Sequence, residues 1–125
     1  METYSTRLWY YAEYKSFRIE SEAGFYKLHV AGFNGDAGDS LSNISEPLSM
    51  QTGMNFSTYD VDNDMTDNIP TCAVRYNSGF WFNRCGSSCL TGMNGTKYFS
   101  WGSLHEYGLQ NLGKLRAARM MIRSI

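Results

Sequence analysis

An acidic run near the middle of the chain places a carboxylate at every second position. Its members are Asp60, Asp62 and Asp64, and Asp67 and Asn68 follow shortly after. A hard cation such as Ca²⁺ binds about six to eight oxygen ligands, which closely spaced carboxylates on a turning loop supply together with backbone carbonyls. The same spacing also fits a solvent-exposed acidic turn. The run therefore predicts a loop, which is either a calcium site or a solvent-exposed acidic turn.

Two other loop motifs do not fit the sequence. An EF-hand requires Gly at its sixth position and Glu at its twelfth, where this run has Met65 and Thr71. The glycine-rich segment 35–39 has no Lys-Ser or Lys-Thr after it and no strand–loop–helix frame around it, so it is not a nucleotide-binding loop.

The composition narrows the class of protein. A length of 125 residues suits one small domain or a piece of a larger one, and 42% hydrophobic residues suffice for a modest core. The formal charge is −1 and only 18% of residues are charged, which argues against a nucleic-acid partner. The aromatic content of 15% suits a core or a recognition surface. Twelve Gly against two Pro predict many turns.

The sequence also bears on where the protein works. The apolar stretch Leu8–Ala12 is too short and too rich in tyrosine for a signal peptide, and no run reaches transmembrane length. We therefore expect a soluble protein whose export signal, if any, lies outside this sequence. Three N-x-Ser/Thr sequons begin at Asn43, Asn55 and Asn94, and they favour an extracellular, glycosylated protein.

Three cysteines, Cys72, Cys85 and Cys89, leave an odd thiol. In a secreted protein an odd number implies a partner elsewhere or a free thiol. A zinc site would need a fourth ligand, and His29 and His105 lie far away in sequence without ligand spacing. Zinc is therefore not expected.

Alternation of apolar and polar residues gives the expected strands. Leu8–Glu20 is read as one or two strands, and Phe25–Val30 as a half-buried strand with Tyr26, Leu28 and Val30 on its inner face. The tail is ambiguous, since its composition favours helix and its alternation favours strand, and we take the strand. The other expectations, in order, are loop over Gly32–Ser57 with a helical turn at Leu41–Ile44, an acidic loop over Thr58–Thr71, a strand at Ala73–Tyr76, a turn at Gly79 before an aromatic cluster, and an extended segment over Tyr98–Trp101.

The residues around the acidic run form a wider signature. Phe56–Asp64, followed by Cys72 and Ala73, resembles the FSTxDxDND…CA signature of fibrinogen-related domains, such as the C-termini of fibrinogen chains, ficolins, tachylectins, angiopoietins and tenascins. The resemblance implies an α+β fold, with a small antiparallel sheet followed by a loop-rich, irregular calcium-binding subdomain. Further segments match the family in order and spacing from about Tyr11 to the end of the sequence: Tyr26–Leu28, Gly35–Ser40, Gly79–Phe82 with Cys85, Leu90–Gly92, and Met120–Arg123.

The resemblance implies a Ca²⁺ site. The family's calcium-binding aspartates align with Asp62 and Asp64, and carbonyls would come from the region of Thr66 to Asn68. Asp60 would orient the loop. The segment between Asp64 and Cys72 is about two residues longer than the family pattern and contains Pro70, so the set of carbonyls is left open.

The resemblance also implies the cysteine pairing. The family's disulfide aligns with Cys72 and Cys85. Cys89 would then be a buried free thiol, an interchain bridge or the partner of a cysteine elsewhere. The family's peptide bond before its second cysteine can be cis, which corresponds to Arg84–Cys85. A non-proline cis bond costs roughly 3–4 kcal/mol and persists only under constraint.

A ligand surface beside the calcium loop follows from the same resemblance. We expect Arg84, Cys85, Gly86, Tyr98 and Trp101 to form it. The alternative is that both aromatic residues, like Trp81, belong to the core. Two departures affect the ligand: Gly86 stands where acetyl-binding lectins often have His, and Asn94 replaces the tyrosine of the LNGxY motif.

The resemblance covers somewhat over half of a full family domain. Residues 1–50 would be a remnant of the central sheet subdomain, 51–115 the calcium and ligand subdomain, and 116–125 a closing strand. Residues before Tyr11 would be poorly ordered or an atypical replacement for lost strands. Such a piece has unpaired strand edges, which an oligomer or missing N-terminal regions would cover.

Two functions are compatible with these sequence features. The first is a secreted, calcium-dependent lectin that binds glycans or acetylated groups in innate-immune recognition. The second is an extracellular protein-interaction module of the matrix or receptor-ligand type. Catalysis is not expected: His105 and Glu106 are adjacent, would point apart on an extended segment, and have no nucleophile nearby.

Overall fold

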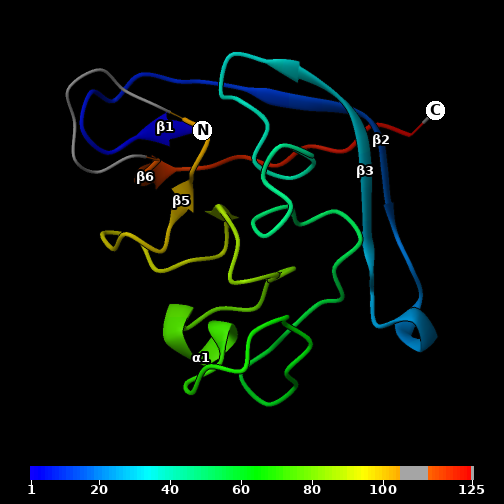
Figure 1. Ribbon diagram of the computed structural model, residues 1–125. Coiled ribbons are helices and arrows are strands. Elements are labelled where there is room, and N and C mark those ends of the chain that lie inside the picture. The colour runs from blue at the N-terminus through cyan, green and yellow to red at the C-terminus, as the bar shows by residue number, and fades with distance from the viewer. Residues whose placement is uncertain (105–112, 125) are drawn as a thin grey trace.

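Short elements joined by long loops make up the molecule (Figure 1). The computed structural model describes residues 1–104 and 113–124. Its strands form three two-stranded antiparallel sheets, which pair β1 with β6, β2 with β3 and β4 with β5. The small antiparallel sheets, the little helix and the loop-rich remainder confirm the predicted fold class. The elements are β1 (Glu2–Thr3), β2 (Ala12–Ile19), the 3₁₀ helix η1 (Glu22–Gly24), β3 (Leu28–Gly35), α1 (Cys72–Tyr76), β4 (Ser88–Cys89), β5 (Ser100–Trp101) and β6 (Leu115–Ala117).

The long hairpin of β2 and β3 curves along one side of the molecule (Figure 1). Leu28 and Val30 are buried, as the alternation of this segment predicts. Tyr26 is not on their face: it precedes β3, has a left-handed φ of 53° and is 46% exposed. β3 also continues through Gly32 to Gly35, where a loop was expected, because β2 offers a hydrogen-bonding partner along the whole length.

The segment Ala73–Tyr76 is helical rather than the expected strand. It belongs to α1, which begins after the extended Thr71 and ends at Asn77 in the left-handed region with a φ of 50°. Alternation over four residues does not separate a strand from a helical turn. Burial of Cys72 and Ala73 decides for the helix here.

The helical turn expected at Leu41–Ile44 is absent, and this segment consists of bends and turns. The carboxylate of Asp39 accepts the backbone N–H groups of Leu41 at 3.1 Å and Ser42 at 2.8 Å. Such local side-chain bonds compete with helix formation, which explains the difference.

The two ends of the sequence pair with each other. Among the described residues, the closing strand expected over 116–125 is limited to β6, because β1 is only two residues long and offers no further partner. The residues before Tyr11 contain a strand, which favours the second of their two expectations, a replacement for lost strands: β1 pairs with β6, and the α-amino group of Met1 donates to the carbonyl of Tyr10 at 2.6 Å. An ion pair between Arg116 and Glu2 at 2.7 Å reinforces this pairing.

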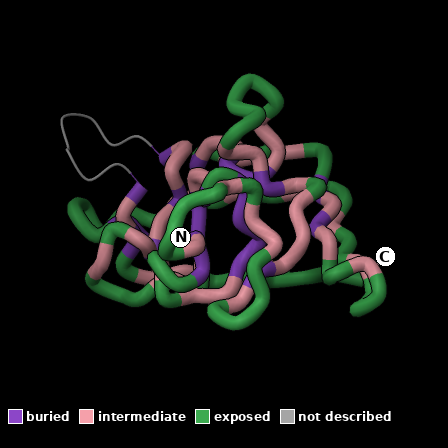
Figure 2. Tube along the Cα trace, turned by 60° about the horizontal axis from the view of Figure 1, so that its bottom comes forward, coloured by how far each residue is buried: buried purple, intermediate pink, exposed green. Residues whose placement is uncertain are grey.

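The core lies between the hairpin and the two smaller sheets, and Figure 2 shows its buried segments enclosed by exposed loops. Gln51 lies within it and is fully buried. Its amide nitrogen donates to the carbonyls of Trp81 at 3.0 Å and Ser88 at 2.9 Å, so the buried polar group is satisfied. The largest apolar side chains with almost no exposure are Leu28, Phe82, Trp101 and Leu115.

Candidate functional site

The loop that carries the acidic run is anchored at its start. Ser57 exchanges backbone hydrogen bonds with Phe80, at 3.0 and 3.2 Å. The Ser57 hydroxyl accepts the N–H of Asn63 at 3.0 Å, and the Asn63 side chain donates to the carbonyl of Phe56 at 2.7 Å. These bonds fold residues 56–63 back on themselves and bring the run onto the core.

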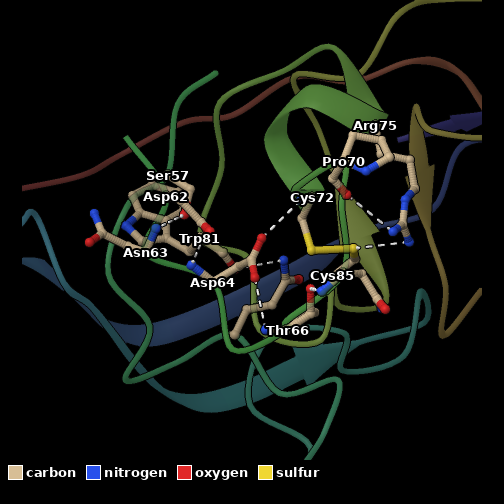
Figure 3. The surroundings of a disulfide bond; sticks show 12 residues. Ser57, Asp62, Asn63, Asp64, Thr66, Pro70, Cys72, Arg75, Trp81 and Cys85 are labelled. Carbon is tan, nitrogen blue, oxygen red and sulfur yellow. Dashed lines mark hydrogen bonds between the residues drawn. A yellow bond between two sulfur atoms is a disulfide. The ribbon is translucent and has the colours of Figure 1, made fainter. Parts of the chain in front are cut away.

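The side chain of Asp64 joins the loop to α1 (Figure 3). One carboxylate oxygen accepts the N–H of Thr66 and the other accepts the N–H of Cys72, both at 2.8 Å. Asp62 lies beside it, and its carboxylate accepts the N–H of Asp64 at 3.1 Å. The two carboxylates predicted as metal ligands are therefore neighbours on one turning loop.

The donor set of this loop fits Ca²⁺ in its chemistry. Asp62 and Asp64 would supply hard carboxylate oxygens to such an ion, and the peptide groups around Thr66 and Asn68 would supply carbonyls. In the part of the protein that the structure describes, no three His, Cys, Asp or Glu side chains gather as a ready metal cluster. A cation at this loop would therefore depend on backbone carbonyls and water for the rest of its ligands.

Asp60 has a different role from its neighbours. Its carboxylate accepts the hydroxyl of Thr58 at 2.7 Å, across a tight turn in which Thr58 and Val61 exchange backbone bonds at 2.9 and 3.2 Å. This contact closes the turn that precedes Asp62, and the orienting role of Asp60 toward a metal stays a prediction.

Asn83 connects the acidic loop to another segment of the chain, and no sequence pattern indicated this role. Its carbonyl accepts the N–H of Met65 at 3.0 Å. Its side chain donates to the carbonyls of Pro47 at 3.0 Å and Met50 at 2.7 Å. It therefore links three segments that are remote in sequence.

A disulfide joins Cys72 to Cys85, the pairing that the resemblance implies, with 5.3 Å between the Cα atoms. Cys89 is a free thiol with no exposed surface. The peptide bond Arg84–Cys85 is trans, contrary to the expectation. The cis bond among the described residues is Ile69–Pro70.

The structure divides the predicted ligand surface. Trp101 is 2% exposed and its indole N–H donates to the carbonyl of Gly38 at 2.9 Å, so it is a core residue and no ligand contact. Cys85 is 6% exposed. Arg84 is exposed, and its backbone N–H donates to the carbonyl of Leu48 at 3.2 Å.

Gly86 packs closely on the core. It has a φ of 107°, and a Cβ built there would lie 3.0 Å from the side chain of Gln51. At the position that often carries His in acetyl-binding lectins, a side chain would therefore adopt a backbone conformation that L residues rarely adopt, and it would press on Gln51.

Tyr98 contacts α1 through Tyr76. Their ring centroids are 4.5 Å apart, and Tyr76 also packs edge-on against Phe82 at 5.1 Å. Burial raises the pKa of the Tyr76 phenol, with the neighbouring Cys89 and Tyr98 adding to the effect. Tyr98 is half-buried, so only part of its ring faces solvent.

The sequons differ in exposure. Asn94 is exposed in a turn, whereas Asn43 and Asn55 are half-buried. The side-chain oxygen of Asn55 is buried without a hydrogen-bond partner. His105 and Glu106 lie outside the described residues.

Known proteins are similar to this chain over most of its length. A family model described as the C-terminal globular domain of fibrinogen beta and gamma chains matches residues 1–123. Rat fibrinogen-like protein 1 is 38% identical over 107 residues, covering 73% of this chain and 33% of the relative. Porcine angiopoietin-2 is 37% identical over 125 residues (90% and 22%), and mouse tenascin is 36% identical over 107 residues (80% and 5%).

Solved structures agree with these sequence matches. The fibrinogen-like globe domain of human ANGPTL2 is similar with a TM-score of 0.71 and 29% identity, over 93% of this chain and 51% of that one. The corresponding domain of human ANGPTL6 has a TM-score of 0.71 and 27% identity, over 92% and 50%. The sequence thus spans about half of these globe domains and a third or less of the curated relatives.

Proposed function

Because this protein belongs to the family of C-terminal globular domains of fibrinogen beta and gamma chains, we propose that it is an extracellular protein-interaction module. Its relatives include a fibrinogen-like protein, an angiopoietin and a tenascin. The proposed activity is recognition, with no catalytic step. No helix among the described residues is long and apolar enough to cross a membrane.

The residues that line the expected sugar pocket favour a protein-interaction module over a lectin. Trp101 is buried in the core, and Gly86 has a positive φ and packs tightly on Gln51, which disfavours a larger side chain there. One face of the Tyr98 ring packs against Tyr76. Sugar pockets need exposed aromatic faces and convergent polar groups, and this region offers few of either. A glycan-binding role thus has the weaker support.

We also propose that the acidic loop binds Ca²⁺ through Asp62 and Asp64, with the carbonyls of Thr66 and Asn68. Bound calcium would neutralise the two carboxylates and hold the loop against α1. The protein's own bonds already prepare this arrangement, because Asp64 connects the loop to the first residue of α1. An ordered loop lowers the conformational cost of binding a partner.

The test compares two arrays under the same buffer. The intact protein that carries this sequence is applied to arrayed extracellular protein domains and to arrayed glycans, each with millimolar calcium and with a chelator. We expect retention on protein domains and none on glycans. Calcium-dependent retention on glycans alone would contradict the proposal and restore the lectin reading.

A further inference from the structure

A shallow groove of about 290 Å³ lies at the tip of the long hairpin, where it meets the acidic loop. Phe25 and Tyr26 form its hairpin side, Phe56 and Val61 its loop side, and Glu22 its end. Phe25 is 56%, Tyr26 46% and Val61 48% exposed. Large apolar groups gathered in one exposed hollow are typical of an interaction site.

The backbone holds these aromatic side chains in an unusual conformation. Phe25 and Tyr26 are consecutive non-glycine residues with left-handed φ angles of 55° and 53°. Such a conformation is strained for residues with a side chain and persists only when the surroundings impose it.

Two hydrogen bonds to the carbonyls of these residues impose it here. The N–H of Phe56 donates to the carbonyl of Phe25 at 3.0 Å, and the indole of Trp81 donates to the carbonyl of Tyr26 at 2.7 Å. The rings of Phe56 and Trp81 also pack edge to face at 5.2 Å. The core thus fixes the hairpin tip in a form that leaves both aromatic rings outside.

The rim of the groove is acidic. Glu22 lines it, and the Asp60 carboxylate lies 2.7 Å from the hydroxyl of Thr58, another lining residue. Neither carboxylate forms an ion pair with a described residue. An apolar hollow with one carboxylate in its lining and a second next to a lining residue, neither in an ion pair, complements an apolar side chain flanked by cations.

We propose that this groove binds an extended polypeptide segment in which an apolar side chain stands next to lysine or arginine. The apolar side chain would occupy the space between Phe25 and Val61, and the cations would pair with Glu22 and Asp60. The proposal rests on the proposed function as a protein-interaction module. It adds a binding surface that does not include Cys85 or the other residues of the expected ligand surface.

The probe is an alternating lysine–leucine hexapeptide with blocked ends, labelled for fluorescence anisotropy and titrated with the intact protein at constant calcium. An alternating glutamate–leucine hexapeptide is the matched negative probe. Phe25→Asn removes the ring but suits the left-handed backbone, because Asn tolerates that region. Val61→Thr keeps the shape and adds a polar group. Tyr59→Ala is the control variant, since Tyr59 is 79% exposed on the same loop without lining the groove.

We expect the lysine peptide to bind at least about tenfold more tightly than the glutamate peptide. Phe25→Asn and Val61→Thr should each weaken it about tenfold, and Tyr59→Ala should not. Equal affinity for both peptides, unchanged affinity in the two groove variants, or displacement by N-acetylglucosamine would overturn the proposal. Retention on the protein array that survives both groove variants would reject the groove and leave the proposed function intact.

Discussion

The carboxylate of Asp64 accepts the backbone N–H of Cys72 at 2.8 Å, which ties the acidic loop to the half-cystine that begins α1. Thr71 occupies the N-cap position of this helix, but its hydroxyl makes no capping bond. Asp64 therefore satisfies a donor at the start of α1 that would otherwise lack a partner. The candidate metal loop, the helix and the disulfide thus meet at one residue.

Replacing Asp64 should destabilise the protein even without calcium. Asp64→Ala leaves the N–H groups of Thr66 and Cys72 without acceptors, and an unsatisfied buried donor costs about 1–3 kcal/mol. Urea unfolding in a chelator measures the loss. Asp62→Ala is the comparison, since its exposed carboxylate accepts a single N–H, and it should cost less. Equal losses would contradict the bridging role of Asp64.

Calcium should stabilise the folded protein through the acidic loop. A ligand that binds only the folded state adds about 2.7 kcal/mol when its concentration is one hundred times its Kd. We expect millimolar calcium to raise Tm and Asp62→Ala to remove most of that rise. Asp67→Asn, a charge loss on the same loop, should leave most of it. A Tm that does not respond to calcium in the unaltered protein would refute the calcium site.

Gly86→Ala should be costly for two reasons. Its φ of 107° is unfavourable for a side chain, and the new Cβ would lie 3.0 Å from Gln51. We expect a loss of about 1–3 kcal/mol in the free energy of unfolding. Gly95→Ala separates the two causes, because Gly95 has a φ of 83° with open space around it. Its loss should be the smaller, and the reverse order would contradict the tight packing at Gly86.

The three cysteines should differ in their chemical state and reactivity. Non-reducing peptide mapping should recover Cys72 linked to Cys85, and Cys89 should react with a thiol reagent only after unfolding, because it has no exposed surface. Removing the bridge with Cys72→Ala and Cys85→Ala together should cost about 3 kcal/mol in the loop-entropy description. A cross-link between Cys85 and Cys89 would contradict the structure.

A rise in pH above about 10 should lower the free energy of unfolding through the ionisation of Tyr14. Burial raises the pKa of its phenol far above the ordinary value, and the hydrogen bond to Asp39 at 2.7 Å adds to this. The unfolded state loses this proton near pH 10 while the folded state keeps it. The contribution is therefore complete below about pH 10 and declines as the pH rises further. Tyr14→Phe should make the decline in unfolding free energy shallower between pH 9 and about 11, and an unchanged slope would refute the assignment.

Much of the fold and the presence of an acidic loop could be predicted because the relevant signals are local. The acidic run and the alternation at Leu28 and Val30 are short patterns with short-range meaning. The order and spacing of the motifs around Phe56–Asp64 predicted the fold class. The segment Ala73–Tyr76 was predicted wrongly, since four residues carry too little periodicity to separate helix from strand.

The sequence by itself thus determined the family, the loop-rich architecture and a loop able to offer oxygen ligands. Only the tertiary structure decided which aromatic residues face solvent: Trp101 is enclosed by the core, while Phe25 and Tyr26 are held outside. It also decided that Gln51 fills the space beside Gly86. These outcomes depend on contacts between residues about 30 or more positions apart. No local pattern encodes such contacts, because they form only when the complete core is packed.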